Sequence, residues 1–367
     1  MIWTYILIAV LLVVAELVYF KVADHFNIID KPNERSSHST IVLRGGGIIF
    51  AISILVWVAL QMVYGEWFMV KDYLPFILGL VMICGVSFID DIHSLPDSLR
   101  MAVQIISILL MYWSIGLYSV ESLGLSVESQ WISVALIGLI VLLSLFFCVG
   151  AANFINFMDG INGITAAYSM AMLLPLAAVN GSWLMVHDSS RICELENGYI
   201  DQSYLIVAII GVLVFSIFNF RPKGKAKCFA GDVGSIGIAF IILFALGRLM
   251  LATKDVTYLV FFLVYGVDGT LTIVHRIMLH EHLGEAHRKH AYQLMANELK
   301  MSHVVVSLLY MVMQLVVSLG FIYLCPNTIL AHWIYFIAAA IVFSVAYVLF
   351  KMKYYHLHEE YLASLKS

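Results

Sequence analysis

The stretch WISVALIGLIVLLSLFFCVG, residues 131–150, contains twenty consecutive residues without a charged side chain. A helix of about 20 residues rises roughly 30 Å, which is the thickness of the hydrocarbon core of a bilayer. Only α-helices and closed β-barrels satisfy their backbone hydrogen bonds in lipid, and this run is too long and too unalternating for a barrel strand. The stretch therefore predicts a transmembrane helix.

The composition of the whole chain is also that of a membrane protein. Of its 367 residues, 62% are hydrophobic and 12% are charged, and the mean hydropathy is +0.95. A soluble domain is nearer half apolar and a quarter charged. Eleven apolar stretches are candidate spans, at residues 2–20, 45–64, 73–89, 101–118, 131–149, 164–180, 203–220, 235–252, 257–275, 304–325 and 328–350. We therefore expect an all-α polytopic membrane protein, with a single transmembrane domain over 1–350 and a short tail over 351–367.

Lysine and arginine are distributed unevenly between the two sides of this arrangement. If the N-terminus is outside, sixteen of them lie in the inner segments and only Lys71, Arg191 and Lys254 lie in the outer loops. Basic residues are enriched in cytoplasmic loops, so we expect the N-terminus outside and the C-terminus in the cytoplasm. The first span lacks the basic region and cleavage site of a signal peptide, and we expect it to be retained.

Chemically diverse residues gather in the inner loops. These loops cover residues 30–47, 88–100, 153–163, 219–235 and 275–293. The longest outer loop, 181–202, is acidic and carries no recognisable motif. The five cysteines are scattered without a C-x-x-C pair, which indicates neither a disulfide framework nor a zinc site. We therefore expect the functional site on the cytoplasmic loops.

Asp90 and Asp91 end the third span. They could simply form a hydrated helix end. A helix C-terminus, however, carries partial negative charge, so two adjacent carboxylates there are better explained by a cation or a proton that they bind. A hard ion such as Mg²⁺ prefers oxygen ligands and usually shares its coordination shell with substrate phosphates.

FINFMDGINGI, residues 154–164, places Asn156, Asp159 and Asn162 beside two glycines and without a nearby lysine or arginine. The glycines would let a ligand approach the backbone closely. The alternative is an Asx-type turn that caps the next helix. Both interpretations stay open for this segment.

FAGDVGS, residues 229–235, precedes the eighth span. Asp232 and Ser235 could cap that helix, whereas a glycine-bracketed turn at a helix N-terminus also suits an anion. Three lysines shortly upstream would favour a phosphorylated ligand, although they equally satisfy the bias toward positive inner loops.

EAHRKHAYQ, residues 285–293, offers His287, Arg288 and His290. The two histidines could lie on one helical face and bind zinc, but no third ligand is evident. Basic residues opposite carboxylates suit phosphate better, and arginine gives bidentate contacts. The alternative is an amphipathic helix at the membrane interface.

Two carboxylates lie inside predicted spans. Asp268 is in the ninth, about two turns, or roughly 10 Å, from its inner end. Burying a charge in hydrocarbon is costly, so an intramembrane aspartate is a functional candidate. Glu16 lies closer to the end of the first span and could merely reach the interface.

Together these segments resemble the polyprenyl-phosphate N-acetylhexosamine-1-phosphate transferases of glycosyltransferase family 4. This family includes initiators of bacterial lipid-carrier glycans and the phospho-MurNAc-pentapeptide transferases. DKPNERSSH…RGGG, FIDD, NFMDGING, FAGDVGS and HRKH follow the family's order over residues 30–293. The resemblance implies a multi-pass enzyme of the bacterial inner membrane with eleven spans, the N-terminus outside and a catalytic domain over 1–350.

The resemblance also implies residue roles. Asp232 would hold Mg²⁺, or Mn²⁺, against the diphosphate. Asp90 and Asp91 would deprotonate the lipid phosphate and organise the metal site, with Asp91 as a second ligand. His287, Arg288 and His290 would approach the diphosphate and sugar. With Asp268 added, the expected substrate-binding residues are Asn156, Asp159, Asn162, Asn219, Phe229, which would stack on uracil, and Asp268.

Three departures from the family pattern concern the donor sugar. Asn162 stands where most members have aspartate, and Tyr265 stands where many initiators have proline. The last motif, HRKHAYQ, is shorter than the full histidine cluster of the peptidoglycan enzymes. It is similar to the branch that starts O-antigen-like glycans, some of whose members use 6-deoxy-HexNAc donors.

We therefore expect transfer of a HexNAc-1-phosphate group, GlcNAc or a 6-deoxy-HexNAc, from a UDP-sugar to undecaprenyl phosphate. UMP would be released, and a cell-surface polysaccharide such as the O-antigen of lipopolysaccharide would be initiated. The partners are these substrates and membrane lipids, without nucleic acid, and a homodimer is compatible with the sequence. The alternative is a transporter of a nucleotide sugar or lipid-linked sugar, but such proteins place charges near the midplane, often within inverted repeats. Here the acids cluster at inner helix ends and no repeat is visible.

Overall fold

The computed structural model describes residues 2–30, 41–118, 121–125, 127, 129–181, 198–282 and 287–364. The α-helices are α1 (Ile2–His25), α2 (Ile48–Val63), α3 (Trp67–Ile92), α4 (Asp97–Ile115), α5 (Gln130–Phe157), α6 (Ile164–Asn180), α7 (Gln202–Asn219), α8 (Gly231–Thr253), α9 (Leu263–Met278), α10 (Ala291–Asn297), α11 (His303–Tyr323) and α12 (Ile329–Ser364). Two 3-10 helices, η1 (Glu121–Leu123) and η4 (Val256–Phe262), and two short strands, β1 (Ile29–Asp30) and β2 (Val42–Leu43), complete the elements.

The predicted membrane-spanning architecture is confirmed in its helices. Within the described residues, nine segments are helical, long and apolar enough to cross a bilayer, and the shorter apolar helices α2 and α6 account for the remaining two predicted spans. The ninth span differs in detail, because Val256–Phe262 form η4 before α9 begins. The last helix, α12, continues through the predicted boundary at residue 350 to Ser364. The orientation with the N-terminus outside stays a prediction.

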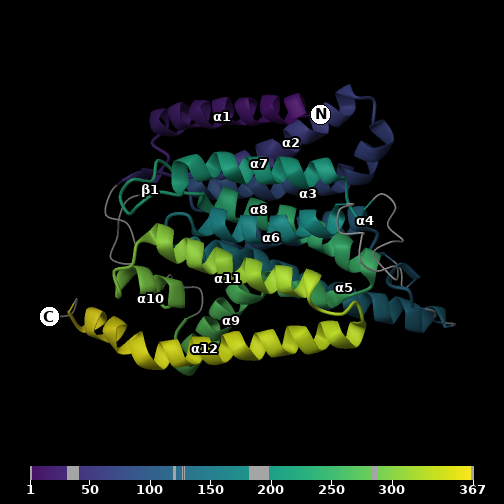
Figure 1. Cartoon of the computed structure of the whole chain (residues 1–367). Coiled ribbons are helices and arrows are strands. Elements are labelled where there is room, and N and C mark those ends of the chain that lie inside the picture. The colour runs from purple at the N-terminus through teal and green to yellow at the C-terminus, as the bar shows by residue number, and fades with distance from the viewer. Residues whose placement is uncertain are drawn as a thin grey trace.

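Helix α8 forms the centre of the bundle. In its most apolar window 67% of the residues are buried, against 6% for α5 and none for α12. Figure 1 shows α1 and α12 on opposite sides of the bundle, with α8 and α6 between them. A helix that is apolar all round must be surrounded by protein or lipid. The large exposed side chains of α5, such as Trp131 and Phe146, are therefore placed to face lipid.

A very small β-structure departs from the purely helical prediction. β1 and β2 pair antiparallel, and Leu43 forms a parallel bridge with Cys228. The amide of Phe229 also donates to the carbonyl of Leu43 over 2.8 Å. These contacts attach the segment after β2 to the start of α8, at the end of the bundle where Figure 1 places β1 and α10.

Candidate active site

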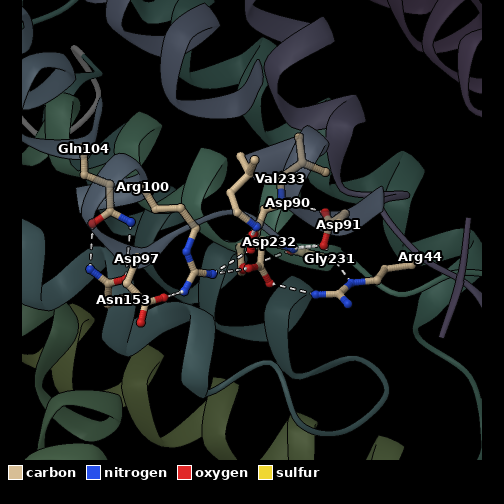
Figure 2. Close-up of polar contacts among 12 residues, drawn as sticks. Arg44, Asp90, Asp91, Asp97, Arg100, Gln104, Asn153, Gly231, Asp232 and Val233 are labelled. Atoms are coloured by element: carbon tan, nitrogen blue, oxygen red, sulfur yellow. Dashed lines mark hydrogen bonds and ion pairs between the residues drawn. The ribbon is translucent and has the colours of Figure 1, made fainter. Parts of the chain in front are cut away.

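Acidic and basic side chains meet where α3 ends and α8 begins. Asp90 and Asp91 lie in the last turn of α3, and Asp232 lies in the first turn of α8. Arg44, from the loop after β2, and Arg100, from the first turn of α4, flank these carboxylates on opposite sides (Figure 2). Sequence reasoning predicted the three aspartates and assigned no role to either arginine.

Asp91 holds the N-terminus of α8. Its carboxylate accepts the amide of Asp232 over 2.9 Å and the amide of Val233 over 3.0 Å. The Nε of Arg44 lies 2.7 Å from the same carboxylate, and the Asp91 side chain is fully buried. The first amides of a helix lack intrahelical partners and carry partial positive charge. The amides at the start of α8 therefore offset the repulsion between the Asp91 carboxylate and the partly negative C-terminal end of α3.

A glycine makes this contact possible. Gly231 has a φ of +71°, and an added Cβ would lie 2.5 Å from the Oδ2 of Asp91 and 2.8 Å from the amide nitrogen of Gly45. Neither the backbone angle nor the space admits a side chain at this position. The glycine in FAGD thus allows α3, α8 and the loop after β2 to approach one another.

Asp90 has a different set of partners. One oxygen accepts the amide of Leu95 over 2.6 Å, and the other accepts Nη1 of Arg100 over 2.6 Å. Arg100 also contacts the exposed Asp97 over 2.5 Å. Asp90 therefore joins the end of α3 to the start of α4.

Asp232 is the most accessible of the three carboxylates. Its side chain is 15% exposed, against 6% for Asp90 and none for Asp91. Its oxygens lie 3.1 Å from Nη2 of Arg44 and 3.5 Å from Nη1 of Arg100. The Asn156 side chain also hydrogen-bonds Asp232. Asp232 therefore contacts both arginines and is also the carboxylate of the three that solvent or a ligand can reach most easily.

The backbone around Arg44 explains why this arginine is so placed. Its amide donates to the carbonyl of Ile28 over 3.0 Å, and its carbonyl accepts the hydroxyl of Tyr19 over 2.5 Å. Three glycines follow, and a Cβ on Gly47 would lie 2.3 Å from the Cα of Gly234. An arginine beside a run of glycines, next to an acidic motif in the fold, is the sequence signal that could have identified it.

A cavity of about 310 Å³ opens beside Asp232. It is lined by Asp30, Arg44, Asn156, Asp159, Gly160, Ile161, Asn162, Phe229, Gly231, Asp232, Ser235, Gln293 and His303. The lining includes five of the residues predicted from the sequence. Gln293 and His303, from α10 and the start of α11, were not predicted. Gln293 ends the HRKHAYQ motif, of which only His287, Arg288 and His290 were named, and nothing in the sequence around His303 indicates that it reaches a loop more than a hundred residues away.

Asp159 does not cap α6 in the usual way. The residue before that helix is Gly163, which has a φ of +86° and makes no side-chain cap. Instead, the hydroxyl of Thr165 donates to the carboxylate of Asp159. Burial raises the pKa of Asp159 to about 6, and the charge of Asp232 adds to this effect against the opposing Thr165 bond.

Asn162 and Asn219 join two loops to each other. Nδ2 of Asn162 donates to the carbonyls of Arg221 and Pro222 over 3.0 and 3.1 Å. Oδ1 of Asn219 accepts the amide of Gly163 over 2.8 Å. Both residues are only 2% exposed, and of the two only Asn162 lines the cavity. In the structure these amides position the loops around the cavity.

Asp268 lies apart from the cavity and binds the histidine motif. One oxygen accepts the amide of Ala291 over 3.0 Å and lies 3.3 Å from Nδ1 of His290. The other accepts the hydroxyl of Tyr310 over 2.7 Å and the amide of Tyr292 over 3.3 Å. This intramembrane carboxylate thus holds the start of α10, the helix that brings Gln293 to the cavity.

The other residues of the histidine motif do not line the cavity either. Arg288 donates to the hydroxyl of Tyr361 over 3.1 Å and lies over its ring, with Glu298 4.0 Å away. Burial and then the positive charges around it lower the pKa of His287 to about 3, so its ring is neutral near pH 7. The structure places Arg288 against α12, away from the three-aspartate cluster. Residues 31–40 and 283–286, which include parts of two motifs, lie outside the described residues.

The residues present fit a Mg²⁺ ion that is completed by a substrate. Among the described residues, no three His, Cys, Asp or Glu side chains are grouped as a protein-only metal site. Mg²⁺ commonly uses one or two carboxylates, with water and substrate phosphates in the other positions. Asp232 meets this requirement because it faces the cavity. Asp91 fits less well, because its oxygens already accept two amides and Arg44.

Comparison with known proteins identifies the family. The profile of glycosyl transferase family 4 matches residues 73–250, which include the three-aspartate cluster and the Asn156–Asp159 loop. The chain belongs to glycosyl transferase family 4. It is a multi-pass membrane protein of a family of bacterial cytoplasmic-membrane transferases.

Several members of glycosyl transferase family 4 are similar to this chain. A Bacillus subtilis protein, named a probable undecaprenyl-phosphate N-acetylglucosaminyl 1-phosphate transferase, is 25% identical over 284 residues, 74% of this chain and 70% of the relative. The decaprenyl-phosphate N-acetylglucosaminephosphotransferase of Mycobacterium leprae is 26% identical, over 60% of this chain and 54% of its own. The phospho-N-acetylmuramoyl-pentapeptide-transferase of Streptococcus thermophilus is 28% identical, over 54% of this chain and 56% of its own. The chain thus spans little more than half the length of the last two relatives.

Proposed function

We propose that this family member transfers a HexNAc-1-phosphate group from a UDP-sugar to undecaprenyl phosphate and releases UMP. The donor would carry GlcNAc or a 6-deoxy-HexNAc, and the product would initiate a cell-surface polysaccharide. The observation that carries the proposal is the position of Asp232. Its carboxylate lies between two arginines and lines the cavity. This arrangement suits a diphosphate and its metal ion.

The reaction is a displacement at phosphorus. An oxygen of the lipid phosphate attacks the β-phosphorus of the nucleotide sugar, and the bond to the UMP oxygen breaks. Such transfers depend on positioning and on neutralising charge at the phosphoryl oxygens. Mg²⁺, when bound at Asp232, would supply part of this neutralisation. Arg44 and Arg100 would supply positive charge from the protein, and Asp90 or Asp91 would accept the proton of a protonated lipid phosphate.

The cavity beside Asp232 would receive the nucleotide sugar. Asn156 and Asp159 offer hydrogen-bonding groups to it, and Phe229 offers an aromatic face for a base. Asp268 would act on this site indirectly, by holding α10 and thereby Gln293. The histidine motif would position α10 beside the cavity and hold the end of α12 through Arg288.

The test is UMP release by the purified protein in detergent. Undecaprenyl phosphate and Mg²⁺ would be supplied with UDP-GlcNAc, UDP-GalNAc and UDP-linked 6-deoxy-HexNAc donors in parallel, and an Asp232→Asn variant would serve as the control. We expect release that requires both lipid and Mg²⁺ and is lost in the variant. No release with any donor from well-folded protein would refute the proposal. Transfer in detergent, where no compartment exists, would exclude a transport-only role.

A further inference from the structure

Both oxygens of Asp232 face a guanidinium group (Figure 2). Oδ1 lies 3.1 Å from Nη2 of Arg44, and Oδ2 lies 3.5 Å from Nη1 of Arg100. These are the oxygens that a divalent cation at Asp232 would need. A divalent cation would compete with the two arginines for these oxygens, because cations repel one another at such short distances outside bulk water.

Each arginine has a second carboxylate that would keep its charge paired. Arg44 contacts Asp91 over 2.7 Å, and Arg100 contacts Asp90 over 2.6 Å. Both distances are shorter than the contacts that the same arginines make with Asp232. Release of Asp232 would therefore leave neither guanidinium without an anionic partner.

The two arginines also have room to move. Their side chains are each 35% exposed, whereas the Asp91 side chain that pairs with Arg44 is fully buried. Arg44 lines the cavity together with Asp232. If Arg44 rotates away from Asp232, it would remain beside any phosphate that enters the cavity, and its planar donors suit bidentate contact with phosphate oxygens.

We infer that Arg44 and Arg100 are exchangeable counter-ions of Asp232, which occupy its oxygens in the free protein and leave them when a metal ion binds, after which Arg44 contacts the donor diphosphate. This inference rests on the proposed function, because it takes Asp232 as the metal ligand. It assigns the arginines two opposite effects. Both arginines weaken binding of the metal alone, and Arg44 strengthens binding of the nucleotide diphosphate in the presence of metal.

The test measures these two effects separately in an Arg44→Gln variant. Binding of Mn²⁺ alone is followed by loss of the free-ion signal in electron paramagnetic resonance, and binding of UDP is followed by calorimetry at saturating Mg²⁺. We expect Mn²⁺ to bind at least tenfold more tightly to the variant than to the wild type, and UDP to bind at least tenfold more weakly. An Arg44→Lys variant, which keeps the charge, should bind Mn²⁺ within about threefold of the wild type.

The matched control is Lys21→Gln, which removes one positive charge from an exposed position near the end of α1. Its Mn²⁺ and UDP dissociation constants should both equal those of the wild type. Asp232→Asn in the Arg44→Gln background should abolish the gained Mn²⁺ affinity. If Arg44→Gln binds Mn²⁺ no more tightly than Lys21→Gln, or if UDP affinity is unchanged, the exchange is refuted.

The outcome can be distinguished from failure of the proposed function. Unchanged metal affinity in a protein whose wild type releases UMP would refute the exchange alone. Absence of UMP release would refute the proposed reaction, whatever the metal titrations show. Thermal unfolding of each variant would establish that the compared proteins are equally folded.

Discussion

Replacement of Asp91 by asparagine tests whether this aspartate stabilises the fold by holding the N-terminus of α8. The change keeps the size of a fully buried side chain but removes its charge. An amide offers one oxygen, so it cannot accept both the Asp232 and Val233 amides as the carboxylate does. Its nitrogen would instead point a donor at a donor.

The cost can be estimated from these contacts. A hydrogen bond to a charged group contributes about 1.5–3 kcal/mol, and breaking one side of a buried ion pair costs roughly 3–5 kcal/mol. These terms overlap, so we expect Asp91→Asn to lower the free energy of unfolding by about 3–5 kcal/mol. With the entropy of unfolding typical of globular chains, this corresponds to a fall of roughly 4–6 °C in melting temperature.

The matched variant is Asp232→Asn. Asp232 is partly exposed, and its contacts with the two arginines are longer than those arginines' contacts with Asp91 and Asp90. The cluster holds three carboxylates and two guanidiniums, so loss of the Asp232 charge leaves two negative and two positive groups. We expect both variants to lose UMP release, but Asp232→Asn to change stability by less than about 1 kcal/mol.

Melting curves of the purified proteins in detergent, followed by intrinsic fluorescence, measure the difference. The reasoning is refuted if Asp91→Asn melts with the wild type, or if Asp232→Asn loses as much stability as Asp91→Asn. Either result would mean that Asp91 does not hold α8 as the contacts indicate.

Three further predictions concern other positions in the site. Gly231→Ala should cost at least about 2 kcal/mol and abolish UMP release, because of its positive φ and the 2.5 Å approach to Asp91, whereas Gly85→Ala, with open space around it, should do neither. Asp159→Asn should melt higher than the wild type at pH 8 but equally near pH 4; the folded pKa of about 6 lies above the unfolded value, so ionisation destabilises the wild type as the pH rises, by up to about 3 kcal/mol. Equal melting temperatures at pH 8 would contradict this. Asp268→Ala should lower stability by about 3–5 kcal/mol, because it leaves the first amides of α10 without their acceptor, and an unchanged melting curve would show that Asp268 does not anchor that helix.

The membrane-spanning helices could be predicted from the sequence because lipid imposes a strong local rule. Each backbone group must be satisfied within its own helix, so length and apolarity alone reveal a span. The predicted range 164–180 coincides with α6, and 45–64 contains α2. The limits of α9 and α12 were less predictable, because the start of α9 follows a 3-10 turn and the end of α12 contacts Arg288 and Glu298, on either side of α10.

The site was only partly predictable. Asp90, Asp91, Asp159 and Asp232 were found because carboxylates are rare in such an apolar chain. The sequence could not show which of them anchors a helix and which faces a cavity, since Asp90 and Asp91 are adjacent and yet have different partners. Asp268 illustrates the same limit. The free energy cost of burying its charge in the membrane indicates that it has a partner, but not whether that partner is a ligand or another part of the protein.

The amino-acid sequence by itself determined that this protein is a bundle of membrane-spanning helices whose candidate acidic site residues lie mostly at one end. The tertiary structure alone decided that Arg44 meets Asp91 and Asp232, across 47 and 188 positions of sequence, and that Gln293 reaches the loop of Asp159. The physical reason is that burial in lipid acts on each segment separately, whereas ion pairs and cavities depend on the close packing of glycine-bearing loops. Which charges neutralise one another is therefore fixed only when Gly47 and Gly231 bring those loops together.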